Sequence, residues 1–126
     1  MKDIHSLKFT KSHEWIAPDG TVGISDHAQK EVTDVVFVEL PPIGKPVSKE
    51  GETATIESVK AAFPIYSPVS GKVTAVNDKA AQDVTLVHKD PFGQGWLFKI
   101  DLSNPDETAN LLNEDAYNKS TAESAH

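Results

Sequence analysis

Apolar residues recur in this chain at the spacing of β-strands, in short runs that end at turn-forming residues. Three such runs lie near the amino terminus, at residues 8–10, 14–16 and 21–24, and Pro18-Asp19-Gly20 marks a turn between the last two. Alternating burial along a strand produces this spacing, and proline and glycine suit the turns between strands. The pattern predicts an all-β core built from many short strands.

The strongest predicted strand is Val35-Val36-Phe37-Val38-Glu39-Leu40, which is almost continuously apolar and is stopped by Pro41-Pro42. Its β-branched and aromatic residues favour a strand, and we expect it in the core. Before it, Ser25 or Asp26 can cap a short helix over residues 27–31, because either side chain can accept hydrogen bonds from the first free amides of a helix.

A weak internal repeat follows. Gly44-Lys45-Pro46-Val47 and Gly71-Lys72-Val73-Thr74-Ala75-Val76 each open a strand after a corner marked by proline. Two similar strand units on either side of a turn predict a barrel or sandwich with approximate two-fold symmetry.

The last third of the chain changes character. After Asn77-Asp78 we expect an irregular connection, then a strand at residues 96–100. Ser103 or Asn104 can cap a helix with Pro105 at its first position. The apolar residues expected on the inner face of this helix are Ala109, Leu111, Leu112 and Tyr117. We expect one domain over residues 1–126, with a core at about 8–117 and a frayed tail after about 120.

Charge and composition exclude several functions. The 126 residues carry a net charge of −7 without a cluster of basic residues, which argues against nucleic acid as a partner. The chain has no cysteine, so its own side chains offer no thiol redox chemistry. Neither a membrane-spanning run nor a secretory signal is evident, which favours a cytoplasmic protein, or a mitochondrial one only if this is a processed mature chain.

No catalytic constellation stands out. The five histidines, at positions 5, 13, 27, 88 and 126, have no metal-binding spacing. His13 fits an ordinary strand residue beside an inward Trp15, because neighbours on a strand point to opposite faces. Gly93-Gln94-Gly95 is a turn and not a phosphate loop, because it precedes a strand rather than a helix. We therefore expect a protein that is not itself an enzyme and holds no metal.

The exception is Glu57-Ser58-Val59-Lys60-Ala61-Ala62. Strand-like residues enter and leave this stretch, so Lys60 falls near a reversal of the chain and should project into solvent. Acylation of this amine would remove its charge and leave a long flexible arm on a rigid base, as a carrier requires. The common alternative is a hydrated lysine at the tip of a loop.

Six blocks of sequence resemble the H-protein family of the glycine cleavage system, in order and over roughly residues 8–117. They are Ser12-His13-Glu14-Trp15, Gly23-Ile24-Ser25-Asp26-His27-Ala28-Gln29, Val36-Phe37-Val38-Glu39-Leu40-Pro41, Glu57-Ser58-Val59-Lys60-Ala61, Ser67-Pro68-Val69-Ser70-Gly71 and Gly95-Trp96-Leu97-Phe98-Lys99-Ile100.

This resemblance implies a lipoyl-domain-like fold, a mainly β barrel-sandwich hybrid, with lipoate amide-linked to Lys60. It implies a carrier of aminomethyl groups and reducing equivalents between three enzymes: a pyridoxal-phosphate glycine decarboxylase (P-protein), an aminomethyltransferase (T-protein) and a dihydrolipoyl dehydrogenase (L-protein). Lipoate-attaching enzymes would be further partners, and we expect a monomer without a membrane partner.

The resemblance also implies roles for two other residues. Ser12 and Glu14 match positions that line the cleft where the loaded arm rests, and Glu14 can accept its ammonium group; the alternative is an ordinary exposed strand carboxylate. The local sequence around Lys60, independently of the resemblance, suggests that the charge of Glu57 marks the site for the modifying enzyme. The chain departs from the family at Phe63-Pro64, where many members have a small polar residue and then Asp, so we expect a more apolar and stiffer cleft wall there.

Other carriers fit less well. A biotin carrier typically places its lysine between methionines, and Met1 is the only methionine in the chain. A lipoyl domain of a 2-oxoacid dehydrogenase more often has Asp before the lysine and continues into a linker and a catalytic core. A lipoyl donor that modifies other proteins, or a regulatory lipoyl carrier unconnected with glycine, stays an alternative.

Overall fold

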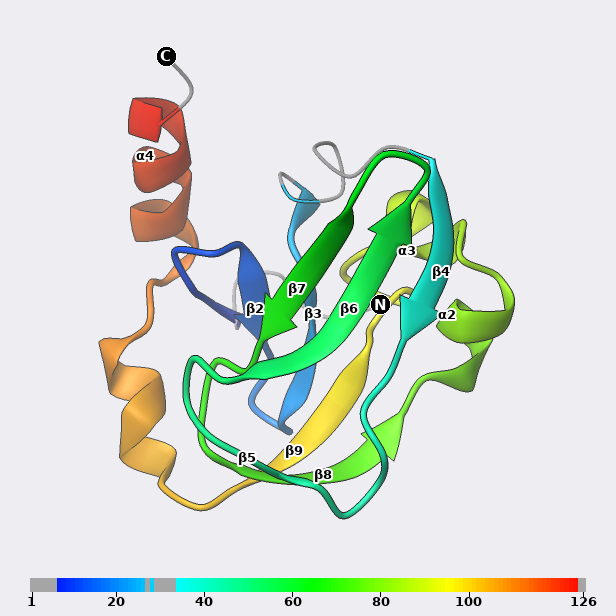
Figure 1. Ribbon diagram of the computed structural model, residues 1–126. Helices are drawn as coiled ribbons and strands as arrows, with labels where there is room; N and C mark the ends of the chain where they lie inside the picture. Colours follow the sequence, from blue (N-terminus) through cyan, green and yellow to red (C-terminus); the bar gives the residue numbers. More distant parts are fainter. Residues whose placement is uncertain (1–6, 27, 29–33, 125–126) are drawn as a thin grey trace.

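The computed structural model describes residues 7–26, 28 and 34–124. Its strands form two antiparallel sheets (Figure 1). The larger sheet has the order β1-β2-β3-β9-β8-β5 and the smaller one the order β4-β6-β7. The strands are β1 (Lys8–Phe9), β2 (Glu14–Ile16), β3 (Thr21–Ile24), β4 (Val35–Glu39), β5 (Pro46–Val47), β6 (Glu52–Ser58), β7 (Ala62–Tyr66), β8 (Gly71–Val76) and β9 (Phe98–Leu102). The predicted mainly β fold is confirmed.

The main core lies between the two sheets. Strands of both sheets turn alternate residues toward it, among them Val22 and Ile100 from the larger sheet and Val38, Ile56 and Ile65 from the smaller one. This alternation is the period-two pattern of the sequence. Figure 1 shows β6 and β7 lying across β2 and β3, with β8 and β9 closing the opposite end.

The amino-terminal hairpin has the predicted form. β2 pairs with β3 in the register Glu14↔Ile24, and the turn between them contains Gly20 at φ 92°. Trp15 is completely buried, and its indole nitrogen donates to the Pro91 carbonyl oxygen at 3.0 Å. Trp15 belongs to a second cluster of buried side chains, which also contains Leu7, Phe9, Ala17 and Tyr117.

The two repeated segments pair with each other. β5 lies antiparallel to β8, with Pro46 opposite Lys72 and Val47 opposite Gly71. Backbone hydrogen bonds from Gly44 to the Val73 carbonyl and from Val73 to the Lys45 carbonyl extend the contact. The repeat therefore marks adjacent strands at one end of the sandwich.

The strand predicted at residues 35–40 lies only partly in the core, to which it contributes Val38. β4 is the edge of the smaller sheet, and only Val38 in it is buried, whereas Val36 and Phe37 are exposed. A β-bulge between Val35 and Phe37 shifts the register against β6. A continuous apolar run does not distinguish a core strand from an exposed edge strand.

The helices also differ in part from expectation. The connection after Asn77 holds two short helices, α2 (Asp78–Gln82) and α3 (Leu86–Lys89). The carboxy-terminal region forms a 3₁₀-helix, η2 (Pro105–Asn110), and a separate helix, α4 (Glu114–Ser124), instead of one helix. Asn104 caps η2 as predicted, through a bond from the Asp106 amide. Ala109 is exposed, contrary to expectation, whereas Tyr117 is buried.

Two further predictions concern the helix at residues 27–31 and the carboxy-terminal tail. The helix predicted at residues 27–31 lies almost wholly outside the described residues, although Ser25 Oγ accepts a hydrogen bond from the Ala28 amide at 3.2 Å, as a cap does. The tail predicted to fray after about residue 120 continues as α4 to Ser124. Within the described residues, no helix is long and apolar enough to cross a membrane.

Candidate functional site

Lys60 lies at the tip of the hairpin formed by β6 and β7, at one end of the molecule (Figure 1). The Ser58 side chain braces this turn: its oxygen lies 3.2 Å from the Lys60 amide and 3.1 Å from the Ala61 amide. The Ser58 amide donates to the Ala61 carbonyl at 2.8 Å. The backbone beneath Lys60 is therefore fixed by local hydrogen bonds.

The side chain of Lys60 is exposed, and its ammonium forms no ion pair with the residues that the structure describes. The predicted position at a chain reversal, projecting into solvent, is confirmed. An exposed amine on a braced turn fits a covalent acyl group, because a modifying enzyme can reach it and the base of the resulting arm stays in place.

Glu57 precedes this turn at the end of β6. It pairs with Ala62 across the hairpin and with Phe37 on β4, so these residues share the outer face of the smaller sheet. Its side chain is half-buried.

Glu14, by contrast, lies deep in the protein, with only 1% of its surface exposed. The hydroxyl groups of Ser12 and Thr10 donate to its Oε1 atom at 2.5 and 2.7 Å. The Tyr66 amide also donates to the carboxylate. The structure thus rules out an ordinary exposed strand carboxylate and brings the predicted pair Ser12 and Glu14 into direct contact.

Burial raises the pKa of the Glu14 carboxyl from its ordinary value of 4.5. Burial acts in this way because a charged carboxylate loses hydration. The hydrogen bonds from Ser12, Thr10 and Tyr66 act in the opposite direction, because they stabilise the charged form. Burial is the larger effect, so Glu14 is a carboxylate for which a cationic partner would be favourable.

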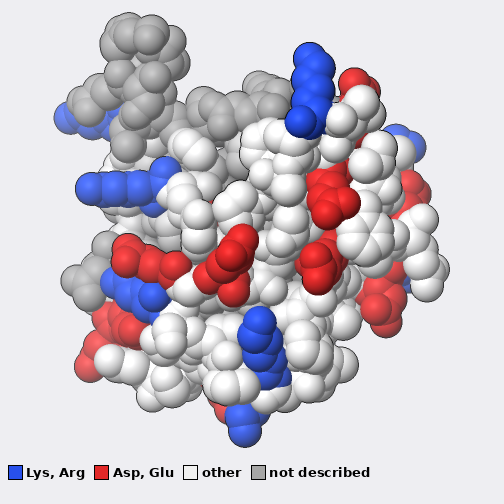
Figure 2. All heavy atoms as spheres, in the orientation of Figure 1, with Lys and Arg blue, Asp and Glu red and all other residues white. Residues whose placement is uncertain are grey.

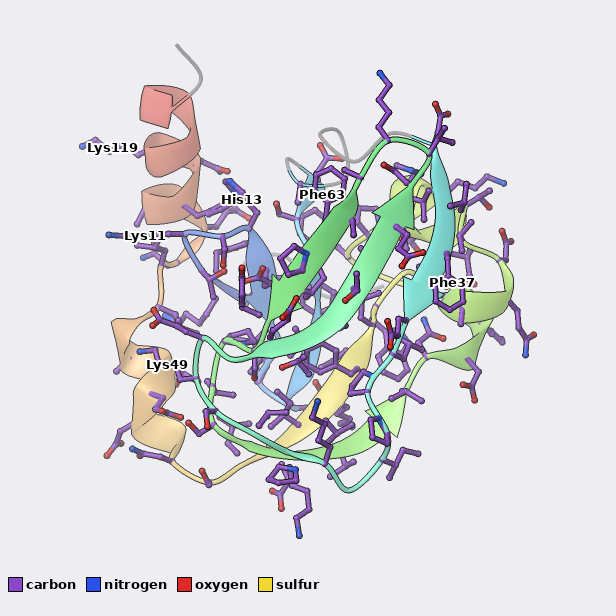
Figure 3. The ribbon with its side chains drawn as sticks, in the orientation of Figure 1. Lys11, His13, Phe37, Lys49, Phe63 and Lys119 are labelled. Atoms are coloured by element: carbon purple, nitrogen blue, oxygen red, sulfur yellow. The ribbon has the colours of Figure 1, made fainter. Side chains whose placement is uncertain are left out.

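A cavity of about 480 Å³ opens beside Glu14. Its walls come from the β1–β2 turn, the segment before β6, the end of β7 and the residues that precede α4. The lining residues are Phe9, Thr10, Lys11, Ser12, Glu14, Lys49, Glu50, Tyr66, Ser67, Pro68, Leu111 and Leu112. Figure 3 shows Lys11 and Lys49 extending from this side of the molecule, near η2 and α4.

β7 connects the hairpin tip with this cavity. It begins two residues after Lys60 and ends at Tyr66, whose amide contacts Glu14. At about 3.3 Å per residue, the strand covers roughly 16 Å. An arm on Lys60 would have to cover a comparable distance to reach Glu14.

Phe63 and Pro64 do not form the apolar cleft wall expected from the sequence. Phe63 packs against the main core and Pro64 is exposed, and neither residue lines the cavity. Their positions on β7 put them between the lysine and the cavity rather than in its wall.

The position of His13 also differs from the expectation. His13 lies in the turn before β2, at φ 75°, and not in the strand. Its Nδ1 atom is 2.7 Å from the Tyr117 hydroxyl, which is also 2.6 Å from Ser25 Oγ. The ring of Tyr117 stacks on Phe9 at a centroid distance of 4.5 Å. These contacts fasten α4 to the hairpin that carries Glu14 (Figure 3).

Sequence reasoning missed Thr10, Lys49, Glu50 and the pair Leu111-Leu112 as cavity residues. Thr10 had a local signal, because its hydroxyl stands four residues before Glu14 in the same turn. The others come from distant segments, and only the folded chain brings them together.

Similarity to known proteins confirms the predicted lipoyl-domain-like fold. The model of the glycine cleavage H-protein family matches residues 7–124. A glycine cleavage system H protein from Thermotoga maritima is 47% identical over 119 residues, which cover 92% of this chain and 96% of the relative. One from Legionella pneumophila (strain Corby) is 49% identical over 123 residues, covering 95% and 98%.

A solved structure is also similar. The crystal structure of a glycine cleavage system H protein from Mycobacterium marinum superposes with a TM-score of 0.85 at 32% identity, covering 94% of this chain and 98% of that one. The similarity therefore extends over both sheets and the hairpin between β6 and β7.

Proposed function

Because this chain belongs to the glycine cleavage H-protein family, a family of lipoyl carriers, we propose that Lys60 is the residue that carries its lipoate. The observation that carries this assignment is the position of Lys60, exposed at the tip of a turn that Ser58 braces. An amide on this nitrogen removes the charge and leaves a long arm attached to a turn whose backbone is held by hydrogen bonds to Ser58.

The attached group would supply what the chain lacks. When bound, the lipoyl dithiolane contributes a reducible disulfide and a sulfur that accepts an aminomethyl group. The protein itself fixes the starting point of the arm at Lys60 and offers the cavity beside Glu14 as a resting place.

We propose that Glu14 holds the ammonium of the load, with Ser12 orienting the carboxylate. The described donors to this carboxylate are the Ser12 and Thr10 hydroxyl groups and the backbone amides of Tyr66 and Glu14, so an ammonium would share an oxygen atom with these donors or displace one of them. A charge-assisted hydrogen bond from an ammonium would be strong in this buried place. The ammonium would also stabilise the charged form of the buried Glu14 carboxylate and so lower the pKa of this group.

The remaining roles are proposals of the same kind. Glu57 would serve the lipoate-attaching enzyme as a charge beside the target lysine. The arm would visit glycine decarboxylase, aminomethyltransferase and dihydrolipoyl dehydrogenase in turn, while this chain performs no catalysis itself. We place the protein in the cytoplasm, as a single carrier domain.

Reconstitution tests this function directly. The lipoylated chain should support CO₂ release from glycine by a glycine decarboxylase of the system. Lys60→Arg should abolish this support, whereas Lys72→Arg, a change at an exposed lysine on β8, should leave it intact. A lipoylated chain that gives no CO₂ release would refute the glycine role and favour the lipoyl-donor alternative.

A further inference from the structure

Three exposed apolar side chains lie on β4 and beside Lys60. Val36 and Phe37 on β4 are 58% and 49% exposed, and Val59, beside the lysine, is 72% exposed. Single exposed apolar side chains are ordinary, but neighbouring ones indicate an interaction site. We call these three residues the β4 face.

Strand pairing places the β4 face close to the hairpin tip. Phe37 lies opposite Glu57, three residues before Lys60, and its neighbour Val38 points inward opposite Ile56. The Val59 amide donates to the Asp34 carbonyl at 3.3 Å, which joins the tip of the hairpin to the start of β4. Paired strands are about 5 Å apart, so Phe37 is a near neighbour of the segment that bears the lysine.

The charged side chains on β4 and β6, and that of Asp34 just before β4, are all acidic. Asp34 and Glu39 are exposed and Glu57 is half-buried, and neither β4 nor β6 contains a lysine or arginine. Figure 2 shows acidic side chains among uncharged surface in the region where β4 and β6 lie in Figure 1. Figure 3 shows Phe37 beside β4, at the edge of the sheet away from β7. The complementary partner has an apolar depression with a basic rim.

We propose that the β4 face is the recognition surface for the enzyme that acylates Lys60, which is a protein with such a depression and rim. This inference rests on the proposed attachment at Lys60. In the reaction, the Nζ amine attacks the carbonyl carbon of a lipoyl adenylate. The amide C–N bond forms, the bond from that carbon to the phosphate oxygen breaks, and AMP and a proton leave.

The short reach of the lysine favours this partner. An enzyme that acts on the bare amine must approach within one lysine side chain of the turn, and the β4 face begins there. Enzymes that act on the far end of an attached arm are separated from the turn by the length of that arm. The surface beside the turn is therefore most valuable to the enzyme that attaches the group.

The test measures acylation of the unmodified chain by a lipoate–protein ligase with lipoate and ATP, at varied chain concentration. Phe37→Ser should raise KM about 10-fold or more, the scale of a lost aromatic anchor, with kcat retained. Phe37→Leu should restore most of the affinity. Ile43→Ser is the matched control, because Ile43 is 66% exposed but lies beyond Pro41-Pro42, after β4. Thermal unfolding checks that each variant folds.

Three outcomes would overturn the inference. These are an unchanged KM in Phe37→Ser, an equal effect of Ile43→Ser, or a defect of fully lipoylated Phe37→Ser that appears in glycine decarboxylation but not in acylation. Absence of an adduct on Lys60 in the wild-type chain would instead refute the proposed function. Higher salt should also raise the wild-type KM, because salt screens the attraction between the acidic residues around the β4 face and the basic rim of the ligase.

Discussion

Ser12 Oγ donates to Glu14 Oε1 at 2.5 Å, from a side chain at the surface to a carboxylate that is almost fully buried. Both residues line the cavity beside β2, Ser12 at its exposed rim and Glu14 in its interior. This arrangement also places a charge-bearing group where an apolar side chain would otherwise be expected. Burying a charged carboxylate costs free energy unless a cation pairs with it. The burial of Glu14 therefore indicates that this site binds a cationic group.

Glu14→Gln should shorten the lifetime of the aminomethyl load on the arm. The lost interaction is a hydrogen bond to a charged group, worth about 1.5–3 kcal/mol, which corresponds to loss of the load about 10-fold faster or more. Release of formaldehyde and ammonia from the loaded protein measures this rate. Asp101→Asn, a change at an exposed carboxylate on β9, is the control. An unchanged lifetime in Glu14→Gln would remove Glu14 from this role.

Stability should depend on pH through Glu14. Its folded pKa lies above the unfolded value of 4.5, so the unfolded chain loses this proton first as the pH rises. The free energy of unfolding of the wild type should therefore fall, relative to that of Glu14→Gln, between about pH 4.5 and the raised pKa. Parallel urea titrations of the two proteins over this range measure the difference. A constant or growing advantage of the wild type would contradict the account.

Gly23→Ala should destabilise the protein by about 1–3 kcal/mol, the usual cost of overpacking. A Cβ atom at residue 23 would stand 2.6–2.9 Å from ring atoms of the buried Trp15. Gly44→Ala is the comparison, because a Cβ atom added at residue 44 would have no neighbouring atom within 4 Å. Its destabilisation, about 1 kcal/mol, should come only from the backbone angle φ of 93°, which disfavours residues other than glycine. Thermal and urea unfolding compare the two. Equal small effects would argue against tight packing at Trp15.

Tyr117→Phe should loosen α4 while keeping its ring on Phe9. The variant leaves His13 and Ser25 without the hydroxyl that lies between them, at a cost of about 1–3 kcal/mol. Hydrogen exchange should accelerate in α4 and in the turn before β2, which holds Ser12. Lys119→Ala, an exposed change on the same helix, should have little effect. Unaltered exchange in Tyr117→Phe would show that stacking alone holds α4.

Local sequence patterns predicted the parts of the fold that rest on local physics. The hairpin around Lys60 was predictable, because strand-like residues lead to and from a short turn. The break between η2 and α4 was not, because it depends on a distant partner: Phe9 and Leu112 exchange backbone hydrogen bonds of 2.7 and 2.9 Å. This pairing takes Leu112 out of any helix.

In the candidate site, too, some features were predictable from the sequence and others were not. Lys60, Ser12 and Glu14 were predicted through resemblance, but the burial of Glu14 was not, since nothing in a short strand with one carboxylate indicates its depth. The exposure of Phe37 was missed for the opposite reason. Its apolar neighbours predict a buried strand, and only the register against β6 shows which side chains face outward.

The most direct test of the account is the mass of the protein isolated from its native host, followed by peptide mapping, with Lys60→Arg and Lys72→Arg expressed in the same way. If Lys60 carries the lipoate, the protein bears one lipoyl adduct, located on Lys60, that persists in Lys72→Arg and disappears in Lys60→Arg. A wild-type protein without the adduct, or an adduct that remains in Lys60→Arg, would contradict the account.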